Sequence, residues 1–167
     1  IYLLRKKENQ LMRKKIILRE RFWIRIKMTY EIVTKYIKDL SFKIKDAKSY
    51  FLLEKDIKNY TFVCDIKSVK LKEKIIQADV NLRLIPVNNT SKGNLDVKVE
   101  LSSIIQFNEI GSKDEMEKII LINVPQEVYP SMREVIIHLF KNSGFNKINI
   151  PEKIDFKRLY ESRKNQK

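Results

Sequence analysis

The order of two hydrophobic patterns along the chain constrains the fold more than any other feature of the sequence. Up to residue 107, apolar residues alternate with polar ones over long stretches, as Leu40, Phe42 and Ile44 do. A period of two is typical of strands with one solvated face. We expect strands within residues 30–45, 60–71, 76–84 and 95–107, and helices only after Gly111. This succession predicts an α+β domain, in which a four-stranded antiparallel sheet has its helices packed on one face.

The connections between the expected strands differ in character. Residues 46–58 lose the alternation but keep large apolar groups, which favours an irregular segment that lies on the body or on a partner. The alternation changes phase near Lys67 and Ser68, which predicts a bulge or a strong bend. Residues 88–94 are a turn by composition, with Gly93 able to adopt a positive φ. Short polar connections indicate that the last three strands form an antiparallel meander.

Helix boundaries can be placed from local signals. Pro125 and Pro130 are expected to disturb or restart the helix that contains them, because proline lacks a backbone donor. A last helix is expected to hold Leu159 and Tyr160. The other expected signals are a capping box at Ser112 and Glu115, a stop at Gly144 and an N-cap at Asp155.

The composition excludes several classes of site. The three glycines lie far apart, so a glycine-rich phosphate loop is excluded. Cys64 and His138 are each the single residue of their type, which argues against a disulfide within the chain and against the usual zinc sites. We therefore expect no metal, no cofactor and a reducing, cytoplasmic location. A triad of Ser41, His138 and Asp39 would lack a nucleophile elbow, so an enzyme is not expected.

The net charge of +14 is unevenly distributed. Residues 1–27 hold ten basic and two acidic side chains, so more than half of the excess lies there. Because an internal Met28 stands directly before the first expected strand, we interpret residues 1–27 as a basic extension outside the fold, and residues 28–167 as the domain. The alternatives are a disordered tail with weak affinity for anions, and an arm that binds nucleic acid or an anionic membrane surface.

Two observations argue against the arm. The body lacks a basic and aromatic motif of the kind that binds RNA, so nucleic acid is not an expected partner. No apolar stretch approaches the roughly 18 residues that span a bilayer, so stable membrane insertion is not expected either.

Several runs of residues follow an order that is typical of one known family. They read PQEVYPSMRE at 125–134, SGF at 143–145, INI at 148–150, IDFKRLY at 154–160 and YIKDLSF at 36–42. Their spacing, above all Pro-x4-Pro-x2-Arg-Glu, resembles the bacterial protein-export chaperone family SecB. The resemblance covers most of residues 29–165, although the middle strands match in pattern only.

The resemblance implies a non-enzymatic holdase that assembles as a dimer of dimers. In that family a connection crosses over the sheet after the first strand, and a long helix and a C-terminal helix follow. Such a chaperone keeps preproteins unfolded without ATP and passes them to the motor SecA. The residues are consistent with this, because an unfolded client lacks a fixed shape and is best bound by exposed apolar grooves.

Candidate site residues combine the apolar pattern with the resemblance. Packing on the sheet or in the core is the alternative for each of them. The expected client contacts are Tyr50, Phe51, Leu52, Ile57, Tyr60, Phe62, Ile148, Ile150 and Phe156. The expected oligomer interface or core residues are Met116, Ile119, Ile120, Val135, Ile136 and Leu139.

The charges depart from the family pattern. Family members are typically acidic, whereas residues 28–167 carry a positive balance. Asp39 matches a position of the acidic surface that contacts SecA, but Lys43 stands where the family commonly has Glu. A reversed charge weakens docking of a basic partner segment. The sequence therefore leaves two alternatives open, a general export chaperone and a SecB-like chaperone that protects an antitoxin in a toxin–antitoxin system.

Overall fold

The computed structural model describes residues 28–87, 94–145 and 148–165. The interpretation of residues 1–27 and the expected turn over residues 88–93 lie outside these ranges. The elements are β1 (Tyr30–Ile44), α2 (Ala47–Asp56), η1 (Ile57–Asn59), β2 (Tyr60–Lys72), β3 (Ile75–Pro86), β4 (Leu95–Phe107), α3 (Lys113–Lys118), the π-helical η3 (Ile119–Asn123), α4 (Val124–Asn142) and α5 (Phe156–Lys164). The predicted α+β class is confirmed.

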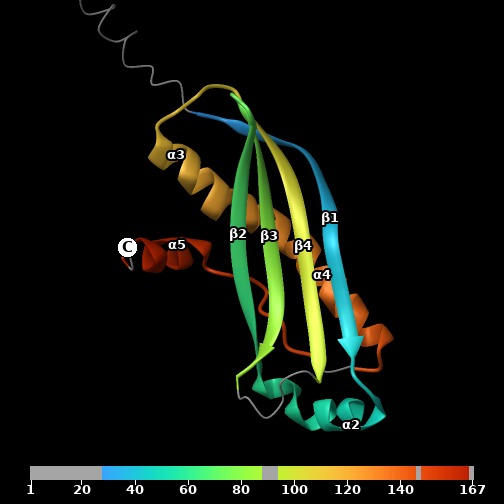
Figure 1. Ribbon diagram of the computed structural model, residues 1–167. Coiled ribbons are helices and arrows are strands. Elements are labelled where there is room, and N and C mark those ends of the chain that lie inside the picture. The colour runs from blue at the N-terminus through green and yellow to red at the C-terminus, as the bar shows by residue number, and fades with distance from the viewer. Residues whose placement is uncertain (1–27, 88–93, 146–147, 166–167) are drawn as a thin grey trace, which may run out of the picture.

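The sheet is antiparallel throughout, with the strand order β1-β4-β3-β2. The predicted meander from β2 to β4 is confirmed. Because β1 pairs with β4, strands β1 and β2 form the two edges, and the connection through α2 and η1 lies at one end of the sheet (Figure 1).

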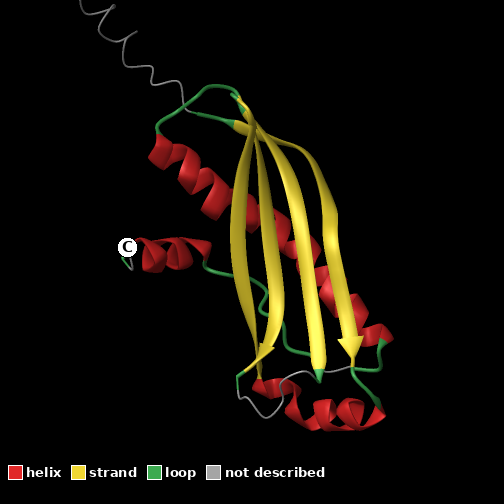
Figure 2. Cartoon of the chain, in the orientation of Figure 1, coloured by secondary structure: helices red, strands yellow, loops and turns green. Residues whose placement is uncertain are grey.

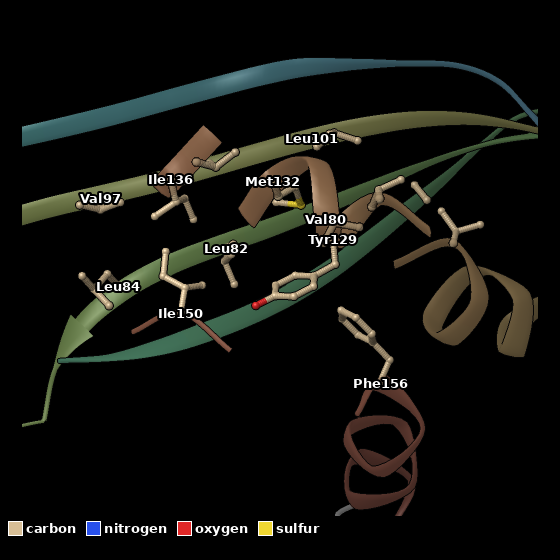
Figure 3. Close-up of a cluster of buried hydrophobic side chains, with 14 of the residues drawn as sticks. Val80, Leu82, Leu84, Val97, Leu101, Tyr129, Met132, Ile136, Ile150 and Phe156 are labelled. Carbon is tan, nitrogen blue, oxygen red and sulfur yellow. The ribbon is translucent and has the colours of Figure 1, made fainter. Parts of the chain in front are cut away.

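One face of the sheet is apolar because side chains alternate along every strand. Leu82 of β3 stands in register between Val99 of β4 and Cys64 of β2. The helical run from α3 through η3 to α4 crosses this face diagonally, so the helices cover one side of the sheet (Figures 1 and 2). Met132 and Ile136 of α4 are completely buried against the strands, as Figure 3 shows.

The long helix tolerates its two prolines differently. In η3 the backbone N–H of Val124 donates to the carbonyl of Ile119, so the turn before Pro125 is widened. Pro125 then occupies the first turn of α4, where no donor is needed, and the expected restart is confirmed. Pro130 lies inside α4 without ending it, so the expected disturbance there is wrong.

The expected helix ends are confirmed. Ser112 and Glu115 form the capping box of α3, and the Asp155 carboxylate accepts the backbone N–H of Arg158 at the start of α5. Gly144 follows α4 with φ of 89°, a left-handed conformation that glycine adopts without strain. A Cβ at Gly144 would also collide with the Tyr50 hydroxyl of α2.

The segment after β1 is helical and not irregular, so that expectation is wrong. Asp46 caps α2 by accepting the backbone N–H of Ser49 at 2.7 Å. Leu53 then anchors the helix, because its side chain is only 1% exposed. Helical spacing places Leu53 inward and leaves Phe51 and Leu52 outward.

The bulge expected at Lys67 and Ser68 is also wrong. The pairing of β2 with β3 is regular there, and the register shift lies between Lys70 and Lys72. The change of phase has another cause, because Val69 lies on the uncovered face of the sheet and is 55% exposed.

The uncovered face carries a network of charges. The Lys38 ammonium contacts Asp79 at 2.6 Å and Glu100 at 3.1 Å. Asp79 also accepts a hydrogen bond from the buried Ser102 hydroxyl. Burial raises the pKa of Asp79, but the hydrogen bonds from Lys38 and Ser102 outweigh it and hold that pKa below its usual range. The network therefore ties β1 to β3 and β4.

Candidate functional site: a groove between strand β2 and helix α5

A groove of about 770 Å³ separates the edge of β2 from α5 and the segment before it. Figure 1 shows α5 to the left of β2, the edge strand on that side of the sheet. This volume lies within the range of ligand sites in proteins. The apolar residues that line it are Tyr60, Phe62, Val63, Cys64, Ile154 and Leu159.

Helix α5 forms a fixed wall because its inward side chains are anchored. Phe156 is 1% exposed and packs edge-to-face on Tyr129, with 6.2 Å between ring centroids (Figure 3). The Tyr129 hydroxyl donates to the carbonyl of Pro151, just before α5. At the other end of the helix, Lys164 contacts Asp114 of α3 at 2.8 Å. Two ends are thus attached, and the remaining face of α5 borders the groove.

Three charged residues line the groove. Arg163 donates to the Cys64 carbonyl at 3.1 Å and contacts the Asp65 carboxylate at 3.3 Å, which links α5 to β2. Asp155 caps α5 through the Arg158 backbone at 2.9 Å. The Arg158 side chain is exposed and makes no hydrogen bond or ion pair with the described residues.

The thiol of Cys64 behaves as an apolar group in the groove. Burial raises the pKa of Cys64 to about 11. The thiol therefore stays protonated at neutral pH and is a poor nucleophile. The floor of the groove at Cys64 can offer apolar contact but not chemistry.

The structure divides the expected client contacts into three groups. Tyr60 and Phe62 line the groove, although Tyr60 is mostly buried. On α2, Phe51 and Leu52 are 66% and 43% exposed. The others, which lie at half-buried or buried positions, are Tyr50, Ile57, Ile148, Ile150 and Phe156.

The most buried of these residues support the groove instead of lining it. Ile150 is 3% exposed and Phe156 is 1% exposed, and Figure 3 shows both beside Tyr129. Tyr50 packs on Phe145 with 5.0 Å between ring centroids, which holds α2 against the segment after α4. These side chains offer a client little surface because the fold already covers them.

The expected interface residues divide in a similar way. Ile119, Ile120 and Ile136 are at most 8% exposed and belong to the core of the subunit. Met116, Val135 and Leu139 are half-buried and retain surface for a partner.

The polar residues singled out in the sequence are separated. Lys98 contacts Asp39 at 2.7 Å and lowers the pKa of that carboxyl, and Ser41 donates to Asp96. His138 is exposed on α4. Within residues 28–87, 94–145 and 148–165, no cluster of three His, Cys, Asp or Glu side chains could hold a metal ion. Every helix in those ranges is too short or too polar to cross a membrane.

The sequence reasoning missed two sets of residues. The first set lies in residues 154–160, the last segment that resembles the family, and in the rest of α5. These residues line one groove only because α5 lies beside β2 in the fold. They are Ile154, Arg158, Leu159 and Arg163. Exposed apolar residues along β1 were also missed, since the alternation predicts one covered face for that strand. They are Val33, Tyr36, Ile37 and Leu40.

The fold is an antiparallel sheet covered by helices on one side, with an open groove along an edge strand that is lined largely by apolar residues. The chain belongs to the SecB family, because the family model described as preprotein translocase subunit SecB matches residues 25–167. The putative protein-export protein SecB of Pelagibacter ubique (strain HTCC1062) is 34% identical over 137 residues, which are 81% of this chain and 97% of that protein. The protein-export protein SecB of Nitrosospira multiformis is 25% identical over 82% of this chain and 84% of that protein.

A solved structure has the same fold. The Mycobacterium tuberculosis Rv1957 SecB-like chaperone, in complex with a ChAD peptide from the Rv1956 HigA1 antitoxin, superposes with a TM-score of 0.53. The match covers 73% of this chain and 89% of that chain at 10% identity, so it supports the fold alone. Family membership supports a chaperone for protein export.

Proposed function

We propose that this protein is an ATP-independent holdase, which binds unfolded or preprotein chains in the cytoplasm and keeps them competent for export. The groove between β2 and α5 carries the proposal, because an open groove lined largely by apolar residues can bind apolar side chains of an unfolded chain that has no fixed shape. Phe51 and Leu52 on α2 extend the apolar surface toward the same end of β2. The proposed role is binding and not catalysis.

Binding by such a surface requires no nucleotide. Each aliphatic or aromatic client side chain that becomes fully buried contributes about 1.5–3 kcal/mol, so a few side chains suffice for reversible capture. A client that buries the same side chains in its own core no longer presents them. The client is then released when it dissociates and goes on to fold or to be exported.

We place subunit contacts first along β1. This strand is an edge of fifteen residues with exposed apolar side chains, and such an edge is a ready template for pairing with another strand. The half-buried Met116, Val135 and Leu139 offer a second surface on the helical layer. Two surfaces of this kind are compatible with a dimer of dimers.

A hand-off to SecA depends on the acidic side chains near Asp39. A basic segment of a partner requires free carboxylates, but Asp39 is paired with Lys98, and Glu100 is paired with Lys38 and Lys98. Asp39 is the expected contact only if a partner can displace that lysine.

A chaperone that protects an antitoxin is the second candidate. The Rv1957 chaperone, which has the same fold, is in complex with a peptide from an antitoxin. The same groove would serve that role with a single dedicated client.

The direct test is refolding of a denatured client with and without this protein, in the absence of ATP. A holdase slows refolding and suppresses aggregation at near-stoichiometric ratios. A Phe62→Asp variant, which places a charge in the groove, should lose this effect, while circular dichroism checks that it remains folded. Unchanged refolding at excess protein would contradict the proposal.

A further inference from the structure

The charged side chains along the groove differ in whether other residues of the protein already contact them. Its one lining carboxylate, Asp155, caps α5 by accepting the backbone N–H of Arg158 through one of its two oxygens, and it keeps its negative charge. The guanidinium of Arg163 is occupied by the Cys64 carbonyl and by Asp65. Arg158 remains, with an exposed side chain that no described residue pairs.

The surroundings of this cation carry more positive than negative charge. The five residues of β2 that line the groove, from Tyr60 to Cys64, carry no charge. From Ile148 to Lys164 there are five basic and three acidic side chains, so the opposite wall is positive. A client that lies in the groove therefore places its own side chains between an apolar floor and an unpaired arginine.

Resting on the proposed holdase function, we infer that the groove selects extended apolar segments that carry aspartate or glutamate beside their apolar residues, and that Arg158 is the residue that sets this preference. A client carboxylate gains a partner, whereas a client lysine meets a like charge that it must approach with less water around it. Selectivity is the difference between these two cases.

The preference is moderate in size. Exposed ion pairs are worth roughly 0.2–1 kcal/mol, so we expect one carboxylate to tighten binding about two- to fivefold over a neutral residue. Repulsion of a lysine is of similar size, so the acidic and basic versions of a peptide differ by about tenfold. Salt screens exposed charges, and the difference should shrink as salt is added.

The experiment measures fluorescence anisotropy of three labelled peptides with the full chain. The peptides share one leucine- and phenylalanine-rich core, and are flanked by aspartate, glutamine or lysine. We expect the aspartate peptide to bind most tightly and the lysine peptide least. Arg158→Gln should bring the three affinities together, and Arg158→Glu should reverse their order.

Lys157→Gln is the matched control, because Lys157 is adjacent and exposed, changes the charge equally and does not line the groove. It should leave the preference intact. Equal affinities of the three peptides, tighter binding of the lysine peptide, or an equal effect of Lys157→Gln would overturn the assignment to Arg158. Failure of all three peptides to bind would contradict the holdase function itself, so the two proposals fail in distinguishable ways.

Discussion

Strands β1 and β2 are both edges of the sheet, but their surroundings differ. Along β1, Val33, Tyr36, Ile37 and Leu40 are between 44% and 54% exposed. Along β2, helix α5 stands opposite the edge and leaves a groove between them. A bare apolar edge favours a permanent partner, whereas a groove with a polar rim favours a ligand that comes and goes. On the basis of this difference we propose assembly along β1 and client binding along β2.

The two edges also differ in their charged contacts. On β1, Lys38 reaches the nearly buried Asp79 of β3 across β4. On β2, Arg163 and Asp65 form a pair in which both side chains are at least 40% exposed. A pair next to buried partners contributes more to stability than an exposed one. We therefore rank the ion pair at the β1 edge above the one at the β2 edge, which joins β2 to α5.

The largest expected effect is on assembly. Ile37→Lys places a charge in the exposed row of β1 and should raise the dissociation constant of the oligomer by about 30-fold, which corresponds to about 2 kcal/mol. Light scattering over a concentration series measures it. Val69→Lys makes a similar change at a 55% exposed position of β2 and should leave assembly unchanged. Equal behaviour of the two variants would remove the distinction between the edges.

The next effect is on stability. Asp79→Ala leaves the buried Ser102 hydroxyl and the Lys38 ammonium without their acceptor, and should cost about 1–3 kcal/mol. Urea unfolding measures the loss. Asp65→Ala breaks the exposed pair with Arg163 and should cost no more than about 1 kcal/mol. If Asp65→Ala costs more than Asp79→Ala, the ranking of the two edges is wrong.

The affinity for a client should fall when an apolar side chain is removed from the wall of the groove. Leu159 lines the groove and is 37% exposed, so Leu159→Ser removes apolar area that a client would bury. We expect affinity for an apolar peptide to fall about fivefold, or about 1 kcal/mol. Ile85→Ser is the control, since Ile85 is 40% exposed on the uncovered face of β3. The idea fails where both serine variants weaken binding alike.

The smallest effect concerns pH and the position of α5. Hydrogen bonds from Lys118 and Lys164 lower the pKa of Asp114 to about 2, against 3.8 without them. Because the folded-state pKa is the lower one, this contribution is complete above pH 3.8 and is lost as the pH falls toward 2. Asp114→Asn should flatten the acid side of a stability profile only slightly, since the carboxylate is exposed. A steep acid transition that survives this substitution unchanged would assign the dependence to other groups.

Much of the fold was predictable from local signals. Alternation located the four strands, and Ser112, Gly144 and Asp155 marked helix ends through their own backbone preferences. The segment after β1 was not predictable in the same way, because α2 depends on the anchoring of Leu53 in the core. The pattern there records apolar residues but not what they pack against.

The site was predictable only in part. Tyr60 and Phe62 line the groove, whereas Ile150 and Phe156 are covered by the fold. All four are apolar residues in strongly patterned segments, so the sequence offers no basis for separating them. Exposure depends on which segment lies above each residue, and that segment is distant in the chain.

The spacing of apolar residues and their order along the chain by themselves determined an antiparallel sheet followed by helices. Backbone geometry makes a spacing of two typical of a strand, and a spacing of three or four typical of a helix. The tertiary structure alone decided which edge stays bare and which one borders a groove. That outcome depends on the packing of Phe156 on Tyr129 and the contact of Lys164 with Asp114, which fix the position of α5, and on Arg163, which joins α5 to β2. Such long-range contacts have no signature in the local order of residues, because each becomes favourable only when the other elements are in place.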